Sequence, residues 1–221
     1  MHTARKNTCT AYKEGFLVLK TTINHYSANA EHYYSLYQSI SASSVHGYLE
    51  QALANITPTT ALDIGAGSGR DANWLAAKGW QVTATEPAEA LLKLAKQHSN
   101  ERVTWCDASL PALANLPTPH QHFDLILLSA VWMHLPIDDR PTAIKRLAEL
   151  LSANGRMYIS LRFGPNVPER PMYPISYEEL QALAAENGLT ARNLNPVPSK
   201  DGLQRSDVEW VTVELIRTGK K

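Results

Sequence analysis

Three glycines at alternate positions, Gly65, Gly67 and Gly69, directly follow the predicted buried strand 61–64 and precede a segment with helical character over residues 71–78. Because glycine has no Cβ, such a turn can be tight and can let the backbone approach a ligand closely. A helix that begins there offers free backbone N–H groups and the positive end of its dipole. The pattern predicts a site for a nucleotide-like ligand that carries a carboxylate or a phosphate.

The residues around the glycines exclude two common nucleotide motifs. A dinucleotide fingerprint requires a small residue at the position of Arg70, and a P-loop requires Lys-Ser or Lys-Thr after the glycines. An acid, Asp63, lies instead two positions before the first glycine. Asp63 could be a surface charge at a strand end or a ligand contact.

Two further acids come directly after predicted strands. Glu86 follows the strand 81–85, and Asp107 follows the strand 103–106. A carboxylate can accept hydrogen bonds from both hydroxyls of a ribose. The alternatives are structural: Glu86 would be an acid at a helix start, where the dipole favours it, and Asp107 would cap the turn that follows.

Strands and helices alternate along the chain, which favours a mainly parallel sheet with right-handed crossovers. Further strands are predicted at 123–129 and 156–161, with a closing hairpin of 190–193 and 210–217. Helices are predicted at 27–40 and 44–55, after strand 123–129 with Pro141 in the first turn, and from Ser176 with Glu179 completing a capping box. In such sheets ligands bind beyond the carboxyl ends of the strands, where the glycines, both acids and the segment after Ser129 fall.

The loop Asp63 to Gly69, Glu86, Asp107 and the segment 123–136 occur in an order that resembles the class I S-adenosylmethionine-dependent methyltransferases of the small-molecule type. The resemblance extends over roughly residues 45–217. It implies an α/β fold with a Rossmann-like, seven-stranded, mostly parallel sheet, helices on both faces and an antiparallel last strand. It also implies S-adenosyl-L-methionine as the cofactor.

The resemblance assigns roles to residues of this chain. Asp63 would lie near the methionine moiety or its ordered water, Glu86 would bind the ribose, and Asp107 would accept from the adenine N6 amino group. The predicted cofactor-binding residues are Asp63, Gly65, Ala66, Gly67, Gly69, Arg70, Glu86, Pro87, Asp107, Ala108 and Ser129. We predict one domain over residues 22–221, with 22–57 as a helical lid over the active site and 1–21 as a flexible arm. No metal site is predicted.

Methyl transfer from a sulfonium is an in-line displacement of an already activated group, so the protein mainly aligns the acceptor and excludes water. An acceptor that is protonated at neutral pH also needs a base. His134 is the predicted catalytic residue because the segment after the fourth strand borders the methyl group in this family. The alternative is a histidine that packs or caps, and Trp132 is equally a pocket wall or a core residue.

Two proline-rich loops, 163–175 and 194–206, are expected beside the acceptor. Arginines there would suit an acceptor with a carboxylate or another anionic group. Alternatively, the arginines are ordinary surface residues and the tyrosines of the first helices face the core. The predicted substrate-binding residues are Tyr26, Tyr37, Trp132, Arg162, Arg170 and Arg205.

The composition of the chain indicates which classes of molecule it could bind. The 221 residues contain 21 Lys plus Arg and 21 Asp plus Glu, and the resulting net charge of +0 argues against nucleic acid. With two cysteines and no long apolar run, we predict a cytoplasmic protein, a monomer or homodimer, that binds a small molecule and no membrane. The predicted function is methyl transfer to a small-molecule acceptor. The alternatives are a non-catalytic S-adenosylmethionine-binding module and a methyltransferase of a protein or RNA.

Overall fold

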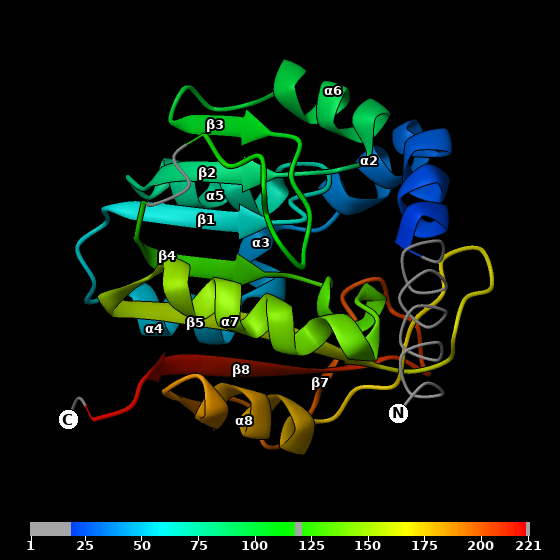
Figure 1. Cartoon of the computed structure of the whole chain (residues 1–221). Helices are drawn as coiled ribbons and strands as arrows, with labels where there is room; N and C mark the ends of the chain where they lie inside the picture. The colour runs from blue at the N-terminus through cyan, green and yellow to red at the C-terminus, as the bar shows by residue number, and fades with distance from the viewer. Residues whose placement is uncertain (1–18, 118–120, 220–221) are drawn as a thin grey trace, which may run out of the picture.

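A sheet of eight strands forms the centre of the computed structural model, which describes residues 19–117 and 121–219 (Figure 1). Seven strands follow the order β3-β2-β1-β4-β5-β8-β6, and β7 pairs with β8. Strands β1 to β5 pair in parallel, and β8 runs antiparallel to β5, β6 and β7. The predicted sheet with an antiparallel last strand is confirmed, and the two-residue β7 is an addition to it. The strands are β1 (Thr60–Ile64), β2 (Gln81–Thr85), β3 (Val103–Cys106), β4 (Phe123–Leu128), β5 (Leu151–Phe163), β6 (Leu189–Asn193), β7 (Ser199–Lys200) and β8 (Glu209–Arg217).

Helices cover both faces of this sheet (Figure 1). Helices α4 and α5 pack on one face, and α7 and α8 pack on the other. Helix α8 begins as predicted, because the Ser176 side chain accepts a hydrogen bond from the backbone N–H of Glu179. The α-helices are α2 (Ala30–Gln38), α3 (Ala42–Val45), α4 (Gly47–Leu53), α5 (Arg70–Ala77), α6 (Glu89–Gln97), α7 (Arg140–Leu150) and α8 (Tyr177–Glu186), with short 3₁₀ turns η1 (Trp132–His134) and η2 (Ile137–Asp139).

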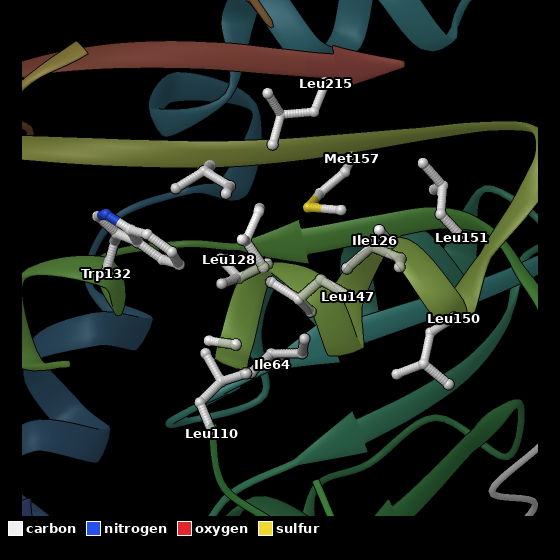
Figure 2. Close-up of a cluster of buried hydrophobic side chains, with 14 of the residues drawn as sticks. Ile64, Leu110, Ile126, Leu128, Trp132, Leu147, Leu150, Leu151, Met157 and Leu215 are labelled. Atoms are coloured by element: carbon white, nitrogen blue, oxygen red, sulfur yellow. The ribbon is translucent and has the colours of Figure 1, made fainter. Parts of the chain in front are cut away.

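The strand side chains alternate between two apolar clusters, as the period of a strand requires. In β4, Leu125 and Leu127 join the cluster beside α5, whereas Ile126 and Leu128 join the cluster beneath α7. Figure 2 shows part of the second cluster, in which Ile126, Leu128 and Met157 meet Leu147 of α7. Both faces of the central strands are therefore dry, and the polar residues that could do chemistry are left at the strand ends.

The N-terminal region differs from the prediction. Residues 19–28 are helical, Asn29 interrupts the helix, and α2 follows, where one helix over 27–40 was expected. The predicted flexible arm 1–21 enters the described part of the chain only at residues 19–21, which are helical; residues 1–18 lie outside it.

The helix expected over residues 44–55 is divided into α3 and α4 at His46. The backbone of His46 leaves the helical region, with φ −114° and ψ 35°. Its side chain lies 2.9 Å from the carboxylate of Asp71 in α5. A long-range contact therefore sets this break, which the local spacing of apolar residues does not reveal.

Strand β5 begins at Leu151, five residues before the expected Arg156. The register between β4 and β5 shifts between Phe123 and Leu125, so the extra residues are accommodated as an irregularity in the ladder. Gly155 lies at this point, where an added Cβ would be 2.8 Å from the carbonyl oxygen of Phe123. Gly155 therefore lies within β5, where it permits a close approach to β4. It does not form a turn before the strand.

Candidate active site

A cavity of about 370 Å³ lies beyond the carboxyl ends of the parallel strands. Its floor comes from the ends of β1, β2, β4 and β5, and its walls come from residues 19–48 and from the segment around β7. The same helical residues lie beside the strand ends in Figure 1. The sheet thus brings residues from 19 to 212 around one space.

The glycine loop forms part of this cavity. Gly65, Gly67 and Gly69 have φ values of +64°, +56° and +77°, in the left-handed region that favours glycine. An added Cβ would lie 2.7 Å from Val131 at Gly65 and 2.9 Å from Trp105 at Gly69. At Gly67 the nearest atom would be a Tyr37 ring carbon at 3.6 Å, an ordinary contact. Gly65 and Gly69 are thus required by packing, whereas the space beside Gly67 opens into the cavity.

A buried group of charges supports the loop. Asp71 pairs with Arg70, with Nε 2.6 Å from Oδ1, and with His46. Burial alone would raise the pKa of Asp71, but the neighbouring His46 and Arg70 outweigh it and lower the pKa far below its usual range. Asp71 was not predicted from the sequence, although its position directly after Arg70 at a helix start is a recognisable signal.

Asp63 lies at the end of β1, is 1% exposed and lines the cavity. Within the described part of the chain its Oδ2 atom has no hydrogen-bond partner. Burial, followed by the nearby charge of Asp71, raises the pKa of Asp63 well above its usual range. A buried acceptor without a partner is costly, and its position fits a ligand that brings a donor to it.

Glu86 faces the glycine loop from the end of β2. Its Oε2 accepts from the N–H of Gly67 at 2.9 Å, and its Oε1 accepts from the N–H of Ala88 at 2.8 Å. Burial raises the pKa of Glu86 to about 7, although both backbone hydrogen bonds oppose this. Each oxygen retains a lone pair, so the carboxylate can accept two hydroxyls, as a ribose diol requires. Pro87 lines the cavity beside it.

The ends of β3 and β4 place the remaining predicted cofactor residues differently. Ala108 and Ser129 line the cavity, together with Ala66 and Arg70. Asp107 does not line it: this residue is exposed at the end of β3, and its backbone carbonyl accepts from Asn115. The neighbouring Ser109 and Leu110 form that part of the wall instead.

Trp132 is a core residue, so its prediction as a substrate contact is corrected. Its side chain is 0% exposed, belongs to the cluster of Figure 2 and lies 5.8 Å from the guanidinium carbon of Arg140. Successive side chains of a 3₁₀ turn point in different directions. Within η1, Met133 and His134 therefore reach the cavity and Trp132 does not.

His134 is 7% exposed and lies in the wall of the cavity. Its Nδ1 is 3.1 Å from the carbonyl oxygen of Pro171, which can only accept, so Nδ1 carries the proton. Nε2 is then the acceptor for the Tyr26 hydroxyl at 3.3 Å. Burial lowers the pKa of His134 to about 4, the charges of Arg170 and Arg162 add to this effect, and the bond to Pro171 opposes it. His134 is therefore neutral at pH 7, with its lone pair toward Tyr26.

The arginines of the cavity have different partners. Arg162 of β5 is 5% exposed and donates to the Pro165 carbonyl and the Met172 sulfur. Arg170 donates to the Tyr26 hydroxyl at 3.3 Å. Neither forms an ion pair with a carboxylate among residues 19–117 and 121–219.

Arg205 lines the cavity but is already paired. Its Nε and Nη2 each donate to Asp201 at 2.8 Å, and Trp210 donates to the same carboxylate at 2.9 Å. Burial alone would raise the pKa of Asp201, but the hydrogen bonds from Arg205 and Trp210 lower it to about 2. The four-residue spacing of Asp201 and Arg205 is the sequence signal for this pair.

Aromatic side chains of the first helices cover the space above His134. The ring centroid of Tyr26 lies 5.9 Å from that of His134 and 4.7 Å from that of Tyr33. Tyr37 of α2 packs near Gly67, and Gln38 donates to the carbonyl of Ser68 in the glycine loop at 3.0 Å. Tyr26 and Tyr37 therefore both line the cavity, as predicted for this region.

Comparisons with known proteins agree with this architecture. Residues 62–159 match the model of the methyltransferase domain family. The probable S-adenosyl-L-methionine-dependent methyltransferase TehB of Haemophilus influenzae is 26% identical over 140 residues, which are 62% of this chain and 46% of TehB. A ubiquinone biosynthesis O-methyltransferase of Xanthomonas axonopodis is 34% identical over 51% of this chain and 47% of its own length. The chain spans about half the length of the curated relatives it matches.

Solved structures share the fold over most of the chain. A Burkholderia thailandensis 1,6-didemethyltoxoflavin-N1-methyltransferase, solved with 1,6-didemethyltoxoflavin and S-adenosylhomocysteine, has a TM-score of 0.67 at 20% identity and covers 92% of this chain and 90% of its own. A TehB-like methyltransferase of Corynebacterium glutamicum has a TM-score of 0.61 at 20% identity, over 86% of this chain and 99% of its own. In its strand order, its glycine loop and the match over residues 62–159, the chain is similar to the class I S-adenosylmethionine-dependent methyltransferases.

Proposed function

We propose that this chain transfers a methyl group from S-adenosyl-L-methionine to a small-molecule acceptor that carries an anionic group. The observation that carries the proposal is the conjunction, in one cavity, of the left-handed glycine loop, the buried Glu86 carboxylate and the partnerless Oδ2 of Asp63. Several relatives are named as methyltransferases of small molecules, which supports the same class of acceptor.

The bound cofactor supplies an electrophilic methyl group on a sulfonium, whose sulfur leaves as a neutral thioether. On this proposal Asp63 and the glycine loop hold the methionine part, and Glu86 holds the ribose. Ala66, Arg70, Pro87, Ala108 and Ser129 form the rest of that half of the cavity, and Asp107 would need to turn inward to reach the adenine.

The acceptor half is assigned to the residues between His134 and the arginines. Tyr26, Tyr37, Arg162 and Arg170 would hold the acceptor, and Arg205 would act through Asp201 more than by direct contact. Residues 22–57 would serve as a lid that excludes water, in one domain with the sheet. A cytoplasmic location and a monomeric or homodimeric state stay predictions of the sequence. None of the helices within residues 19–117 and 121–219 is long and apolar enough to cross a membrane.

The test of function is formation of S-adenosylhomocysteine when the purified chain is incubated with cofactor and pools of small organic acids, followed by mass spectrometry of the methylated product. A non-catalytic binding module would bind the cofactor without turnover in any pool. A protein or RNA methyltransferase would transfer label to macromolecules and not to small acids. Absence of cofactor binding by calorimetry would reject all three.

Glu86→Ala is expected to weaken binding of S-adenosylhomocysteine by about 1.5–3 kcal/mol, because hydrogen bonds to a charged group are lost. Calorimetry on both proteins measures the difference. Glu89→Ala removes an exposed acid from the first turn of α6, three residues further along, and serves as the matched control. Equal affinities of the wild type and Glu86→Ala would reduce Glu86 to a structural acceptor of the Gly67 and Ala88 N–H groups.

Binding of S-adenosylhomocysteine is expected to strengthen as the pH rises through 7. The pKa of Glu86 is about 7. The ionised carboxylate can accept from both ribose hydroxyls, whereas the protonated carboxyl group would first have to lose its proton. Since affinity scales with the competent fraction, binding at pH 6 should be about tenfold weaker than at pH 8. Calorimetry across this range measures it, and Glu86→Gln should flatten the profile. A profile that is equally steep in Glu86→Gln would assign the titration to another group.

A further inference from the structure

Two arginines in the acceptor half of the cavity form no ion pair with a carboxylate within residues 19–117 and 121–219. Arg162 is buried with its Nε atom lacking a hydrogen-bond partner in the described chain, and the Arg170 side chain donates to the Tyr26 hydroxyl and lies over the Tyr33 ring. The carboxylate of Asp201, which lines the same cavity, already accepts from Arg205 and Trp210. A buried charge such as that of Arg162 is normally paired, and the half-buried Arg170 lines the same cavity, so these two guanidinium groups are suited to a bound anion.

The same two arginines surround His134. The groups that face its ring are the Tyr26 hydroxyl from helical residues 19–28, Arg162 from β5, and Arg170 with the Pro171 carbonyl from the loop after β5. The bond to Pro171 fixes the tautomer in which the lone pair of Nε2 points toward the Tyr26 hydroxyl. Nε2 of His134 therefore lies where a base could act. A proton on Nε2, however, would add a third positive charge beside those of Arg162 and Arg170.

We propose that Arg162 and Arg170 form an anion subsite, and that an acid group of the acceptor bound there offsets the positive charge around His134, so that Nε2 can take a proton from a second group of the same molecule. The acceptor class is therefore a small acid with a separate O–H or N–H group, and that separate group is methylated. This inference rests on the proposed function and specifies its acceptor.

The hydroxyl of Tyr26 marks where the second group would bind. It accepts from Arg170 and donates to His134, each at 3.3 Å, so it lies where a hydroxyl can give its proton to Nε2. When the second group of the acceptor replaces the Tyr26 hydroxyl beside Nε2, while the Tyr26 ring still lines the acceptor half, the O–H or N–H proton of that group passes to Nε2. The electron pair of that group forms the bond to the methyl carbon. The electron pair of the broken carbon–sulfur bond stays on sulfur, and the proton later leaves His134 for solvent. A carboxylate acceptor, by contrast, would need no base at all.

The test uses NMR titration of histidine ring C–H signals in the chain saturated with S-adenosylhomocysteine, with His134 assigned by His134→Gln. Sodium benzoate is the anionic probe and benzamide is its neutral isostere; formate and acetate serve as smaller anions. We expect benzoate to raise the pKa of His134 by about one unit and benzamide to leave it unchanged. Arg170→Gln should raise the pKa of His134 without any probe and reduce the further effect of benzoate.

Arg162→Gln should also raise the pKa of His134 without any probe and reduce the further effect of benzoate. If Arg162→Gln does not fold because Arg162 is buried, Arg170→Gln alone tests the inference. Arg102→Gln, which removes an exposed arginine outside the cavity, should leave both the titration and benzoate binding unchanged. A His134 pKa unaffected by all three anions, while S-adenosylhomocysteine still binds, overturns this inference and leaves the proposed function intact. In a separate incubation with S-adenosyl-L-methionine in place of S-adenosylhomocysteine, conversion of benzoate to methyl benzoate would also overturn it, because the anion itself would then be the acceptor. Failure to bind S-adenosylhomocysteine would reject the proposed function instead.

Discussion

Replacing Gly67 by valine is expected to weaken binding of S-adenosylhomocysteine at least a hundredfold, about 2.7 kcal/mol, while the chain stays folded. A Cβ at this position meets only the Tyr37 ring at an ordinary 3.6 Å, so the branched side chain is accommodated by projecting into the cavity. It would occupy space that the ligand needs and would push on the N–H that holds Glu86. Calorimetry measures the affinity, and circular dichroism confirms the fold.

The matched control for this substitution is Gly188→Val. Gly188 also has a left-handed backbone, with φ +69°, but an added Cβ there meets nothing within 4 Å and the residue lies outside the cavity. Both variants carry the backbone strain of a branched residue at positive φ, about 1–2 kcal/mol. Gly188→Val should therefore lose stability without losing affinity. Gly67→Val with wild-type affinity would show that the ligand does not lie against this loop.

Arg140→Ala is expected to lower the free energy of unfolding by about 3 kcal/mol, since removal of one partner breaks a buried ion pair. Arg140 is 0% exposed, and its Nη1 lies 2.8 Å from Oε1 and 2.5 Å from Oε2 of Glu179. It also donates to the carbonyls of Leu135 and Pro174, so it joins α7 and α8 to the segment that carries His134. Because Glu179 keeps some exposure to solvent, its unpaired charge can be partly hydrated, which places the loss at the lower end of the usual range.

Urea denaturation of the wild type and the variant measures this difference. Arg102→Ala, at an exposed position, is the control and should change the free energy of unfolding by less than about 0.5 kcal/mol. A loss below about 1 kcal/mol in Arg140→Ala would mean that the pair contributes little beyond the cost of burying it.

The glycine loop and most of the sheet could be read from local patterns. The predicted bounds of strand β3 are confirmed, and Ser176 caps α8 as expected, although the Glu179 carboxylate pairs with Arg140 instead of completing the capping box. Alternating apolar residues, glycines and capping residues act within a few positions, so their effect on the backbone does not depend on the rest of the chain. The order of the strands cannot be read from such local patterns, and the structure gives it as β3-β2-β1-β4-β5-β8-β6.

The side-chain directions in the acceptor half were decided by the tertiary structure. Trp132 and His134 are two residues apart, yet η1 directs the first into the core and the second toward Tyr26. The periodicity of the sequence does not distinguish the two residues, because in a single turn either side chain could face the core or the cavity. Packing against β5 and α7 selects the observed orientation.

Pairing of charges was decided in the same way. The sequence offered three equivalent arginines, whereas the structure pairs Arg205 with Asp201 and leaves Arg162 and Arg170 without a carboxylate in the described chain. Arg170 reaches the hydroxyl of Tyr26 across 144 positions of sequence. The sequence by itself determined the fold class and the backbone of the glycine loop, since these depend on local residue types, and it predicts the cofactor half of the site. Only the tertiary structure decided which charges remain available to an acceptor, because that depends on which distant side chains packing brings within reach of one another.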